Sequence, residues 1–392
     1  MKLSCSFTPF DTWFFRESRP QGSIGSSELG SVFPPPVRTL LGAVRTAIGD
    51  AWHARHGTDW RQFSQLPALQ ALIGNGESLG NLRVHGPWLL KDGHRLYPAP
   101  ATLMVKDEVY FLLGLGDVVH CDLGRVRLPA FPTRVAGLDN LAGAKPAGQC
   151  WLKAAGWLAI LQGKAPQTEQ VVTARELFHE EPRLGIGRDN ARSSVSEGML
   201  YQTRHLRLLP DVAVELEVDG LPDDLQQQLD LPPQQVIRLG GEGRQASLRL
   251  QPAQAGESLP APDLASAGSA VLYNLTPMPC AHDLPAGIPE GFRPVQHDGI
   301  DYWEGEIAGL GLRLYAVACQ RPLREGGWDM ASHQSRPVES LLPAGSALFV
   351  ELLGDQPGGL QALHHITTGP GAALGRGQLV AGLLPNLTTS GN

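Results

Sequence analysis

Hydrophobic and polar positions change their period within the first 60 residues, and the change predicts a strand followed by a helix. Residues alternate from Leu3 to Phe7, as in a half-buried strand. After the proline run at 33–36, apolar residues recur at helical spacing from Val37 to Trp52, which predicts a helix with one buried stripe. The last proline of the run suits the first position of such a helix.

The stretch from residue 58 to about 182 predicts a long insertion. Strand-like runs within 81–115 flank a predicted hairpin turn at Lys91-Asp92-Gly93, and residues 150–162 predict a buried helix. After the insertion, the pattern predicts strands at 184–187, 199–209, 212–218, 236–239 and 246–250, with a short helix at 222–231. The polar segment 187–198 carries turn residues. The order of elements matches the split βαβ, or ferredoxin-like, arrangement.

The C-terminal part repeats this scheme after a linker at 251–268 that is rich in Pro, Ala, Gly and Ser. Strands are expected at 270–275, 312–318 and 347–353. Each half contains a polar Gly-x-Asp segment, at 187–189 and 327–329, and a late glycine-rich loop. The ordered repeat predicts two related α+β modules, at 1–252 and 268–392.

Composition changes this picture in one respect, which concerns charge. The 42% of hydrophobic residues suffice for packed cores, and the 46 glycines and 32 prolines indicate many turns. The formal net charge of −7 argues against a general nucleic-acid coat, for which a basic domain is expected. Any grip on RNA must therefore be local, and the segment 183–207 offers five arginines against Asp189 and Glu197.

The five cysteines are widely spaced and form no C-x-x-C motif, so neither a disulfide framework nor a metal site is expected. Reduced thiols fit the cytoplasm. Pro9 and Asp11 interrupt the apolar N-terminus, which argues against a signal peptide, and no apolar run approaches the length of a membrane helix. We therefore expect a cytoplasmic protein with no membrane contact, no metal and no cofactor.

The late glycine loop of the first half permits three interpretations. Gly241, Gly243 and Ala246 match the dinucleotide fingerprint G-x-G-x-x-A, but a strand-like run follows where that fingerprint needs a helix. A hairpin whose glycines adopt positive φ is the second interpretation. The third is a backbone that RNA phosphates approach closely, with Arg244 here and Arg376 in the second loop adding charge. A nucleotide-dependent enzyme thus stays open as an alternative.

Two further segments are candidates for RNA contact. In 188–204, arginine forks suit phosphate, Ser193 and Ser194 can donate hydrogen bonds, and Tyr201 can stack on a base. A solvated loop is the alternative there. In 10–20, the aromatic run 13–15 is typical of a core, while Arg16 and Arg19 beside it would form an RNA edge.

Catalytic signals are sparse. The sequence has no H-E-x-x-H, G-x-S-x-G or P-loop motif. His53 and His205 are candidates for a general base that cleaves RNA through the 2′-hydroxyl, although a lone histidine is more often structural. His364 and His365 are adjacent and are expected to face apart. We therefore expect no catalytic residues, and an RNA-processing endoribonuclease is the alternative.

Four of these segments occur together and in order: DTWFFRESRP (11–20), FPPPVRTLLGAVRTAI (33–48), LGIGRDNARSSVSEGMLY (184–201) and IRLGGEGRQA (237–246). In this the chain resembles the third subunit of the Cmr effector complex, a RAMP-superfamily family of type III-B CRISPR systems. The resemblance covers about the first 250 residues and is weaker in the second half of the sequence. It implies two ferredoxin-like, RRM-related βαββαβ domains, the first with the large insertion at about 58–182.

The resemblance also implies a non-catalytic role in antiviral defence. A member of this family would bind the 5′ tag of CRISPR RNA and contact the large polymerase- and cyclase-like subunit and the backbone RAMP subunits of the ribonucleoprotein. Taken with the segments above, the expected RNA-binding residues are Arg16, Arg19, Arg38, Arg45, Gly185, Gly187, Arg188, Arg192, Ser193, Ser194, Tyr201, Gly240, Gly241, Gly243, Arg244 and Arg376.

Overall fold

The structure is a computed structural model that describes residues 2–17, 27–76, 78–189, 194–253, 259–281, 287–329, 334–354, 356 and 358–387. Strands predominate in these ranges, and the α-helices there are α1 (Val37–His56), α2 (Pro67–Ile73), α3 (Ala154–Leu161) and α4 (Leu225–Gln228). The predicted α+β class is therefore confirmed. Within the same ranges, every helix is too short or too polar to cross a membrane.

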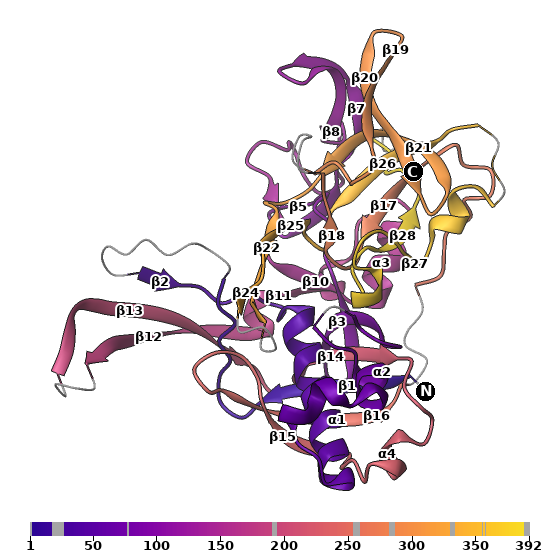
Figure 1. Ribbon diagram of the computed structural model, residues 1–392. Helices are drawn as coiled ribbons and strands as arrows, with labels where there is room; N and C mark the ends of the chain where they lie inside the picture. The colour runs from indigo at the N-terminus through magenta and orange to yellow at the C-terminus, as the bar shows by residue number, and fades with distance from the viewer. Residues whose placement is uncertain are drawn as a thin grey trace. The chain divides into compact units, whose positions relative to one another are not determined.

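Contacts divide the chain into two compact units, each assembled from separate stretches of sequence (Figure 1). Unit 1 comprises Met1–His94, Arg175–Gly256 and Arg324–Glu339, and unit 2 comprises Arg95–Ala174, Glu257–Leu323 and Ser340–Asn392. The polar Gly-x-Asp segment of the second half thus groups with unit 1. The domains expected at 1–252 and 268–392 stay a prediction.

Strand β1 (Leu3–Pro9) lies at the centre of the sheet of unit 1, where the alternation of Leu3, Cys5 and Phe7 places three fully buried side chains on one face. β1 pairs antiparallel with β14 (Val212–Asp219) and with β16 (Gln245–Pro252). β3 (Arg83–Lys91) continues the sheet beyond β14, and β15 (Gln234–Arg238) continues it beyond β16. Along the sheet the order is β3-β14-β1-β16-β15.

This order corrects the predicted insertion. β3 lies inside 58–182, yet it pairs with β14 over the full length of that strand, so it belongs to the central sheet. Asp92 and Gly93 form the predicted turn after β3, both with positive φ. Residues 83–91 are therefore part of the central sheet, which differs from their predicted place in an insertion.

Helix α1 starts at Val37, as predicted, and continues past Trp52 to His56. It ends at Gly57, which adopts the left-handed conformation (φ 65°) and donates its backbone N–H to the His53 carbonyl. Its apolar stripe, which includes Leu40 and Ile48, is buried, and the helix lies against β14 and β15.

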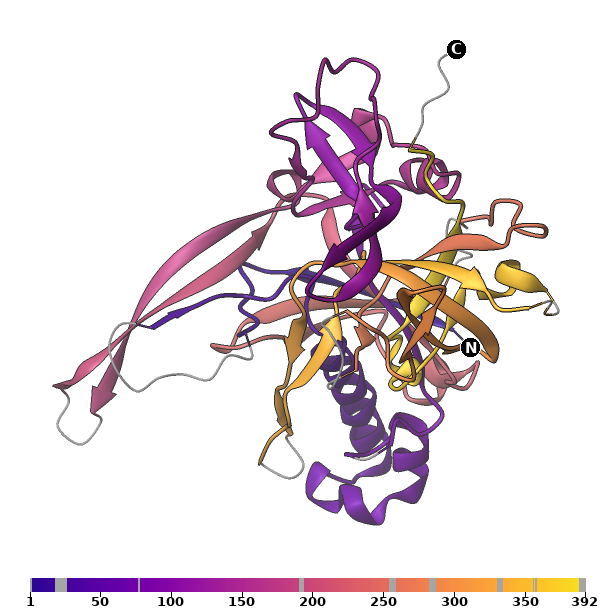
Figure 2. The same cartoon turned by 90° about the horizontal axis from the view of Figure 1, so that it is seen from above.

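A long hairpin extends from unit 1 and is formed by β12 (Phe178–Asp189) and β13 (Ser194–Leu208) (Figures 1 and 2). β2 (Ser27–Leu29) runs parallel to β13. The sequence predicts two short strands separated by a polar turn segment, but most of that segment is strand. The antiparallel ladder continues to the pair Asp189–Ser194, with an irregularity at Gly187, because cross-strand hydrogen bonds outweigh the turn propensity of the polar residues.

The main sheet of unit 2 is built around β17 (Ser269–Asn274). Its order is β19-β20-β21-β26-β17-β28-β27, with bounds Arg293–His297, Ile300–Ile307, Leu310–Ala318, Ala347–Leu352, Ser269–Asn274, Gln378–Gly382 and Ile366–Thr367. The three strands predicted for this half are confirmed as β17, β21 and β26. Fully buried residues such as Leu272, Leu314 and Val350 pack together on one face of the sheet.

Two further predictions for unit 2 need correction. Residues 150–162 do not form one helix, because Cys150–Leu152 is strand β10, paired with β4 (His94–Pro98) and β11 (Val171–Thr173), and α3 begins only at Ala154. A uniformly apolar run has no period that separates strand from helix. The linker is also partly packed, since Leu259 and Leu264 are fully buried.

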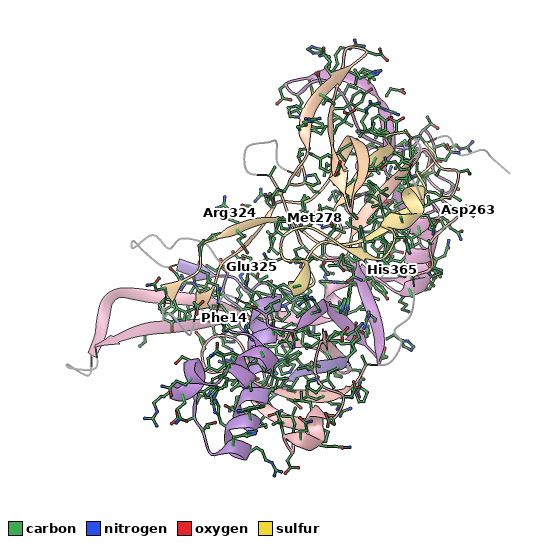
Figure 3. All side chains as sticks on the ribbon, turned by 45° about the vertical axis from the view of Figure 1, so that its right-hand side comes forward. Phe14, Asp263, Met278, Arg324, Glu325 and His365 are labelled. Carbon is green, nitrogen blue, oxygen red and sulfur yellow. The ribbon has the colours of Figure 1, made fainter. Side chains whose placement is uncertain are left out.

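His364 and His365 do not face apart as expected. Both side chains approach the Leu259 carbonyl oxygen, at 2.5 and 2.8 Å from Nε2, and their rings meet edge to face (His365, Figure 3). The reason is the positive φ of His365 (60°), which takes the pair out of regular structure.

Short elements complete the described part. The strands are β5 (Leu103–Lys106), β6 (Val109–Leu112), β7 (Gly114–Cys121), β8 (Gly124–Ala130), β9 (Lys145–Pro146), β18 (Met278–Pro279), β22 (Leu323–Glu325), β23 (Trp328–Asp329), β24 (Gln334–Ser335) and β25 (Glu339–Leu342). The 3-10 helices are Trp60–Gln65, Thr168–Gln170, Ala174–Glu176, Gly359–Leu363 and Ala372–Leu374.

Candidate functional site

Segments that lie far apart in the sequence meet at the base of hairpin β12–β13. The chain just after β1 joins the hairpin through two backbone hydrogen bonds between Trp13 and Leu206, at 2.9 and 2.8 Å. The same stretch holds the glycine loop, because the Gly241 N–H donates to the Phe14 carbonyl at 2.7 Å (Phe14, Figure 3). Trp13, Phe14 and Phe15 are buried, which confirms the core role expected for them.

The proline run before α1 reaches the same place. The Phe33 ring packs against the ring of Phe178, the first residue of β12, with 4.5 Å between centroids. Three of the four segments that carry the family resemblance, 11–20, 33–48 and 237–246, therefore meet at the hairpin base. The described residues of the fourth, 184–189 and 194–201, lie further out on the same hairpin.

The glycine loop is a hairpin between β15 and β16. Gly240, Glu242 and Gly243 have positive φ, and the Leu239 N–H donates to the Arg244 carbonyl at 2.9 Å. This confirms the interpretation of the glycines as turn residues. Strand β16 follows directly, so the helix N-terminus that a dinucleotide fingerprint needs is missing from this loop.

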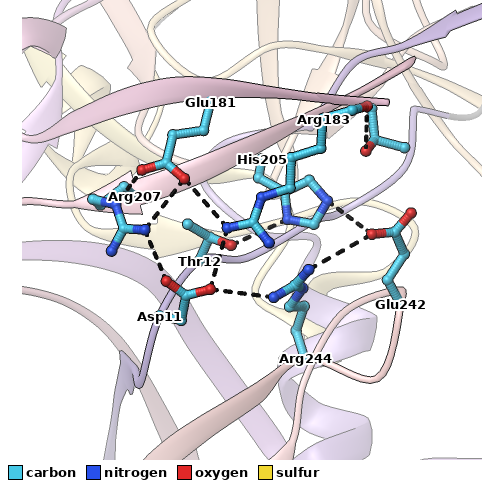
Figure 4. A network of polar contacts seen from close by, with 9 residues as sticks. Asp11, Thr12, Glu181, Arg183, His205, Arg207, Glu242 and Arg244 are labelled. Carbon is cyan, nitrogen blue, oxygen red and sulfur yellow. Dashed lines mark hydrogen bonds and ion pairs between the residues drawn. The ribbon is translucent and has the colours of Figure 1, made fainter. Parts of the chain in front are cut away.

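A network of charged groups surrounds Asp11, the second residue after β1 (Figure 4). Its carboxylate accepts hydrogen bonds from Arg207 at 2.8 Å, from Arg183 at 3.2 Å and from Arg244 at 3.2 Å. Hydrogen bonds from Arg207 and Arg183 lower the pKa of Asp11, so the carboxylate is ionised at neutral pH.

Further carboxylates hold the same arginines. Glu181 accepts hydrogen bonds from Arg207 and, at 3.3 Å, from Arg183, and Glu242 lies 3.8 Å from Arg244. Further out, the exposed Arg204 pairs with Glu28 and, at 2.9 Å, with Glu180. The positive excess counted for 183–207 is thus largely balanced, because the fold brings acids from other segments beside these arginines.

His205 lies at the centre of this network and has no exposed surface. Its Nδ1 lies 3.1 Å from Thr12 Oγ1, its Nε2 lies 2.9 Å from Glu242, and its ring stacks on Phe14. Burial, followed by the charges of Arg183 and Arg244, lowers the pKa of His205. The ring is therefore neutral at pH 7 and links the glycine loop to the chain after β1.

The two histidines considered as general bases are both buried. His205 uses both ring nitrogens within the network, and His53 is 6% exposed with its Nδ1 2.7 Å from Thr58 Oγ1. Either ring would have to become accessible before it could reach a 2′-hydroxyl.

The hairpin itself has two different faces. On one face Tyr201 is the cross-strand neighbour of Gly185, and a Cβ atom on Gly185 would lie 2.2 Å from the tyrosine ring. The ring therefore covers the glycine. The opposite face carries three exposed apolar side chains, Leu184, Ile186 and Leu200, of which Leu184 is 75% exposed.

The other expected arginines are placed differently. Arg16 is exposed, and its backbone bridges to Ser31. Arg38 lies 3.7 Å from Glu325 and 3.6 Å from Glu339. Arg376 is buried, with 3% of its surface exposed, so contact with RNA would require its loop to open.

Arg45 is engaged with the backbone of its own unit. Its guanidinium donates to the carbonyl oxygens of Ile73, Asn75 and Ser78, the last two at 2.8 and 3.3 Å. Arg19, Arg192 and Ser193 lie outside the described residues, and Gly187, Arg188 and Ser194 are described by their backbone alone.

Sequence reasoning missed the acidic partners and the apolar face. Asp11 and Glu181 carry no signal that links them to Arg207, because it lies 196 and 26 residues away along the chain. Glu242 is two residues from Arg244, but nothing in the sequence links it to the distant His205. The apolar face had a signal: Leu184 and Ile186 alternate with Arg183 and Gly185, which is typical of a strand with two different faces.

A family model described as "CRISPR-associated protein (Cas_Cmr3)" matches residues 5–384. The search of curated proteins gave no match. A chain of the "Cryo-EM structure of the Type III-B Cmr-beta bound to cognate target RNA and AMPPnP, state 1" is similar, with 13% identity, a TM-score of 0.47, and coverage of 89% of this chain and 86% of that chain.

A chain of the "Crystal structure of Csm3-Csm4 subcomplex in the type III-A CRISPR-Cas interference complex" is also similar. It has 11% identity and a TM-score of 0.36, with coverage of 91% of this chain and 94% of that chain. The family match extends over nearly the whole length of the sequence and includes all four motif segments. The chain belongs to the Cas_Cmr3 family of CRISPR-associated proteins.

Proposed function

We propose that this chain is a non-catalytic, RNA-holding subunit of a type III-B CRISPR effector complex, and that it anchors the 5′ tag of CRISPR RNA at the base of hairpin β12–β13. The observation that carries the proposal is that three motif segments meet at that base while the fourth lies further out on the same hairpin. The motifs that make the chain similar to its family therefore lie on or beside one hairpin.

The chemistry of this site suits one end of a single-stranded RNA. Tyr201 offers a ring for stacking on a base, and the arginines of the network offer planar donors for phosphates. Backbone amides of the glycine loop add donors without side chains that would block approach. The net charge of −7 favours a local grip of this kind over a general affinity for nucleic acid.

The order of strands supports a second part of the proposal, two ferredoxin-like modules. In chain order the four core strands of unit 1 are β1, β3, β14 and β16. Across the sheet their order is β3-β14-β1-β16, so the second strand of the chain is followed by the third, the first and the fourth. The core strands of unit 2 are β17, β21, β26 and β28, and they lie in the same order. Both sets are antiparallel at every contact, as the ferredoxin-like arrangement requires.

The apolar face of the hairpin supports the proposed partners. Leu184, Ile186 and Leu200 form a continuous exposed group, since Ile186 and Leu200 are cross-strand neighbours. Exposed apolar side chains that adjoin one another are typical of surfaces that bind other proteins. We propose that neighbouring subunits of the complex dock here, the backbone RAMP subunits or the large polymerase-like subunit.

The experiment is purification of the full-length chain from cells that express CRISPR RNA, followed by sequencing of the RNA that co-purifies. The proposal predicts small RNAs with a uniform 5′ end. RNAs with random ends would contradict it. Incubation of the pure chain with repeat RNA in the absence of metal separates the alternative, because cleavage at one site would identify an endoribonuclease instead.

A further inference from the structure

The Asp11 carboxylate occupies a position that an external anion would also fit. Three guanidinium groups donate to it, two from the hairpin (Arg183 and Arg207) and one from the glycine loop (Arg244). Arginine forks bind carboxylate and phosphate with the same planar geometry. The Asp11 side chain is 49% exposed, so the position is open to solvent.

We propose that Asp11 occupies a binding site for a backbone phosphate of RNA, and that the phosphate exchanges with the Asp11 carboxylate when RNA binds. This inference rests on the proposed function and deepens it, because it names one phosphate site and the carboxylate that occupies this site when RNA is absent.

The arginines keep other partners when Asp11 leaves. Arg207 and Arg183 remain bound to Glu181, and Arg244 remains beside Glu242, which is itself fixed by His205. These second carboxylates hold the three guanidiniums in place, so the site does not collapse during the exchange.

The charge balance also fits one phosphodiester. With Asp11 in place, the three arginines face three carboxylates, and the lowered pKa of His205 leaves that ring neutral. Without Asp11 the group carries one net positive charge, which matches the single negative charge of a backbone phosphate. Exposed ion pairs are individually weak, so the exchange has a modest energetic cost.

The test is the affinity of the full-length chain for a short fluorescent single-stranded RNA that carries the 5′ tag. Asp11→Asn removes the competing charge and should bind this RNA about three- to tenfold more tightly than wild type. Asp139→Asn is the matched control, since it makes the same change in net charge at an exposed position in unit 2, and its affinity should equal that of wild type. Arg207→Gln should weaken binding in both the wild-type and the Asp11→Asn background.

Unchanged or weaker binding by Asp11→Asn overturns the inference, because a permanent structural role for Asp11 gives that result. Thermal midpoints establish that each variant is folded, and Asp11→Ser carries the same prediction should Asp11→Asn unfold. Loss of RNA binding from wild type and variant together would overturn the proposed function and the inference, whereas binding by wild type without a gain in Asp11→Asn overturns only the inference. A mononucleotide that competes strongly with the RNA would identify a nucleotide site and contradict both.

Discussion

The ring of Tyr201 covers Gly185 on the neighbouring strand of the hairpin, at a distance that leaves no room for a Cβ atom on the glycine. An aromatic side chain that covers a cross-strand glycine keeps the ladder intact while it holds the ring in one position. The glycine therefore fixes where the aromatic surface lies, and that surface is the part of the hairpin best suited to a base.

Gly185→Ala should displace the Tyr201 ring, since the new Cβ atom would lie 2.2 Å from it. If the ring stacks on a base, displacement should remove about 1–3 kcal/mol of binding free energy, roughly a five- to hundredfold loss of RNA affinity. Fluorescence anisotropy with tag RNA measures this effect. Gly42→Ala on α1, where a Cβ atom meets nothing within 4 Å, is the matched control.

A double-mutant cycle tests the mechanism of that loss. Tyr201→Phe should retain RNA affinity, and Tyr201→Ala should lower it as much as Gly185→Ala does. Once Tyr201 is alanine, Gly185→Ala should have no further effect. Additive losses would show that Gly185 acts independently of the ring.

Gly240 and Gly243 should respond differently to alanine, although both have positive φ. A left-handed backbone makes alanine unfavourable by about 1–2 kcal/mol at either position. At Gly240 the Cβ atom would also lie 2.7 Å from the Phe14 carbonyl oxygen, while at Gly243 it meets nothing within 4 Å. Urea unfolding should therefore show a larger loss of stability for Gly240→Ala. Equal losses would mean that the contact with Phe14 contributes nothing.

The buried His205 predicts a pH dependence of stability. Its pKa in the folded protein is lowered from 6.5, so the unfolded chain binds the proton more tightly than the folded one. The contribution of His205 is complete above pH 6.5 and declines as the pH falls below that value, by at most about 1.4 kcal/mol per pH unit. His205→Gln should flatten the decline in thermal midpoint on acidification. The exposed His120→Gln is the control, and an identical slope in His205→Gln and wild type would refute the assignment.

A substitution of Arg45 can distinguish a structural role of this residue from a role in RNA contact. Arg45→Met removes the donors to three backbone carbonyls and should lower the free energy of unfolding by about 1–3 kcal/mol. RNA affinity, measured where the variant is folded, should stay at the wild-type value. Arg61→Met is the control, because the Arg61 side chain is 92% exposed. A loss of affinity and of its salt dependence without a loss of stability would place Arg45 at the RNA instead, as its motif suggests.

The parts of the fold that local patterns determine could be predicted from the sequence. The alternation in β1 and β16 and the helical stripe of α1 each mark one buried face, because periodicity reports burial directly. The apolar runs that became β14 and β26 are buried on both faces for most of their length. The length of hairpin β12–β13 could not be predicted from local patterns. Its polar residues adopt strand conformation because the two strands pair with each other. The place of β3 in the central sheet depends on its contact with β14, more than 100 residues later.

The sequence predicted individual residues of the candidate site, but it did not predict how their charges are paired. Glycines and arginines can be recognised as candidates from their residue type alone. The fold brings those near the hairpin base together. The sequence gives no means to see that Asp11 would meet Arg207, which lies 196 residues away, or that Arg45 would turn towards α2. Which carboxylate neutralises which arginine is decided by the register of strands that are distant in sequence.

We propose that the 5′ tag lies at the base of hairpin β12–β13, and photo-crosslinking can locate the tag on the protein. A CRISPR RNA with 4-thiouridine within the tag is bound to the full-length chain and irradiated, and the crosslinked peptides are identified by mass spectrometry. The account predicts crosslinks within 181–207 and 240–244, with loss of the hairpin crosslinks in Tyr201→Ala. Crosslinks confined to unit 2, or crosslinks that also form when the tag is moved to the 3′ end, would contradict it.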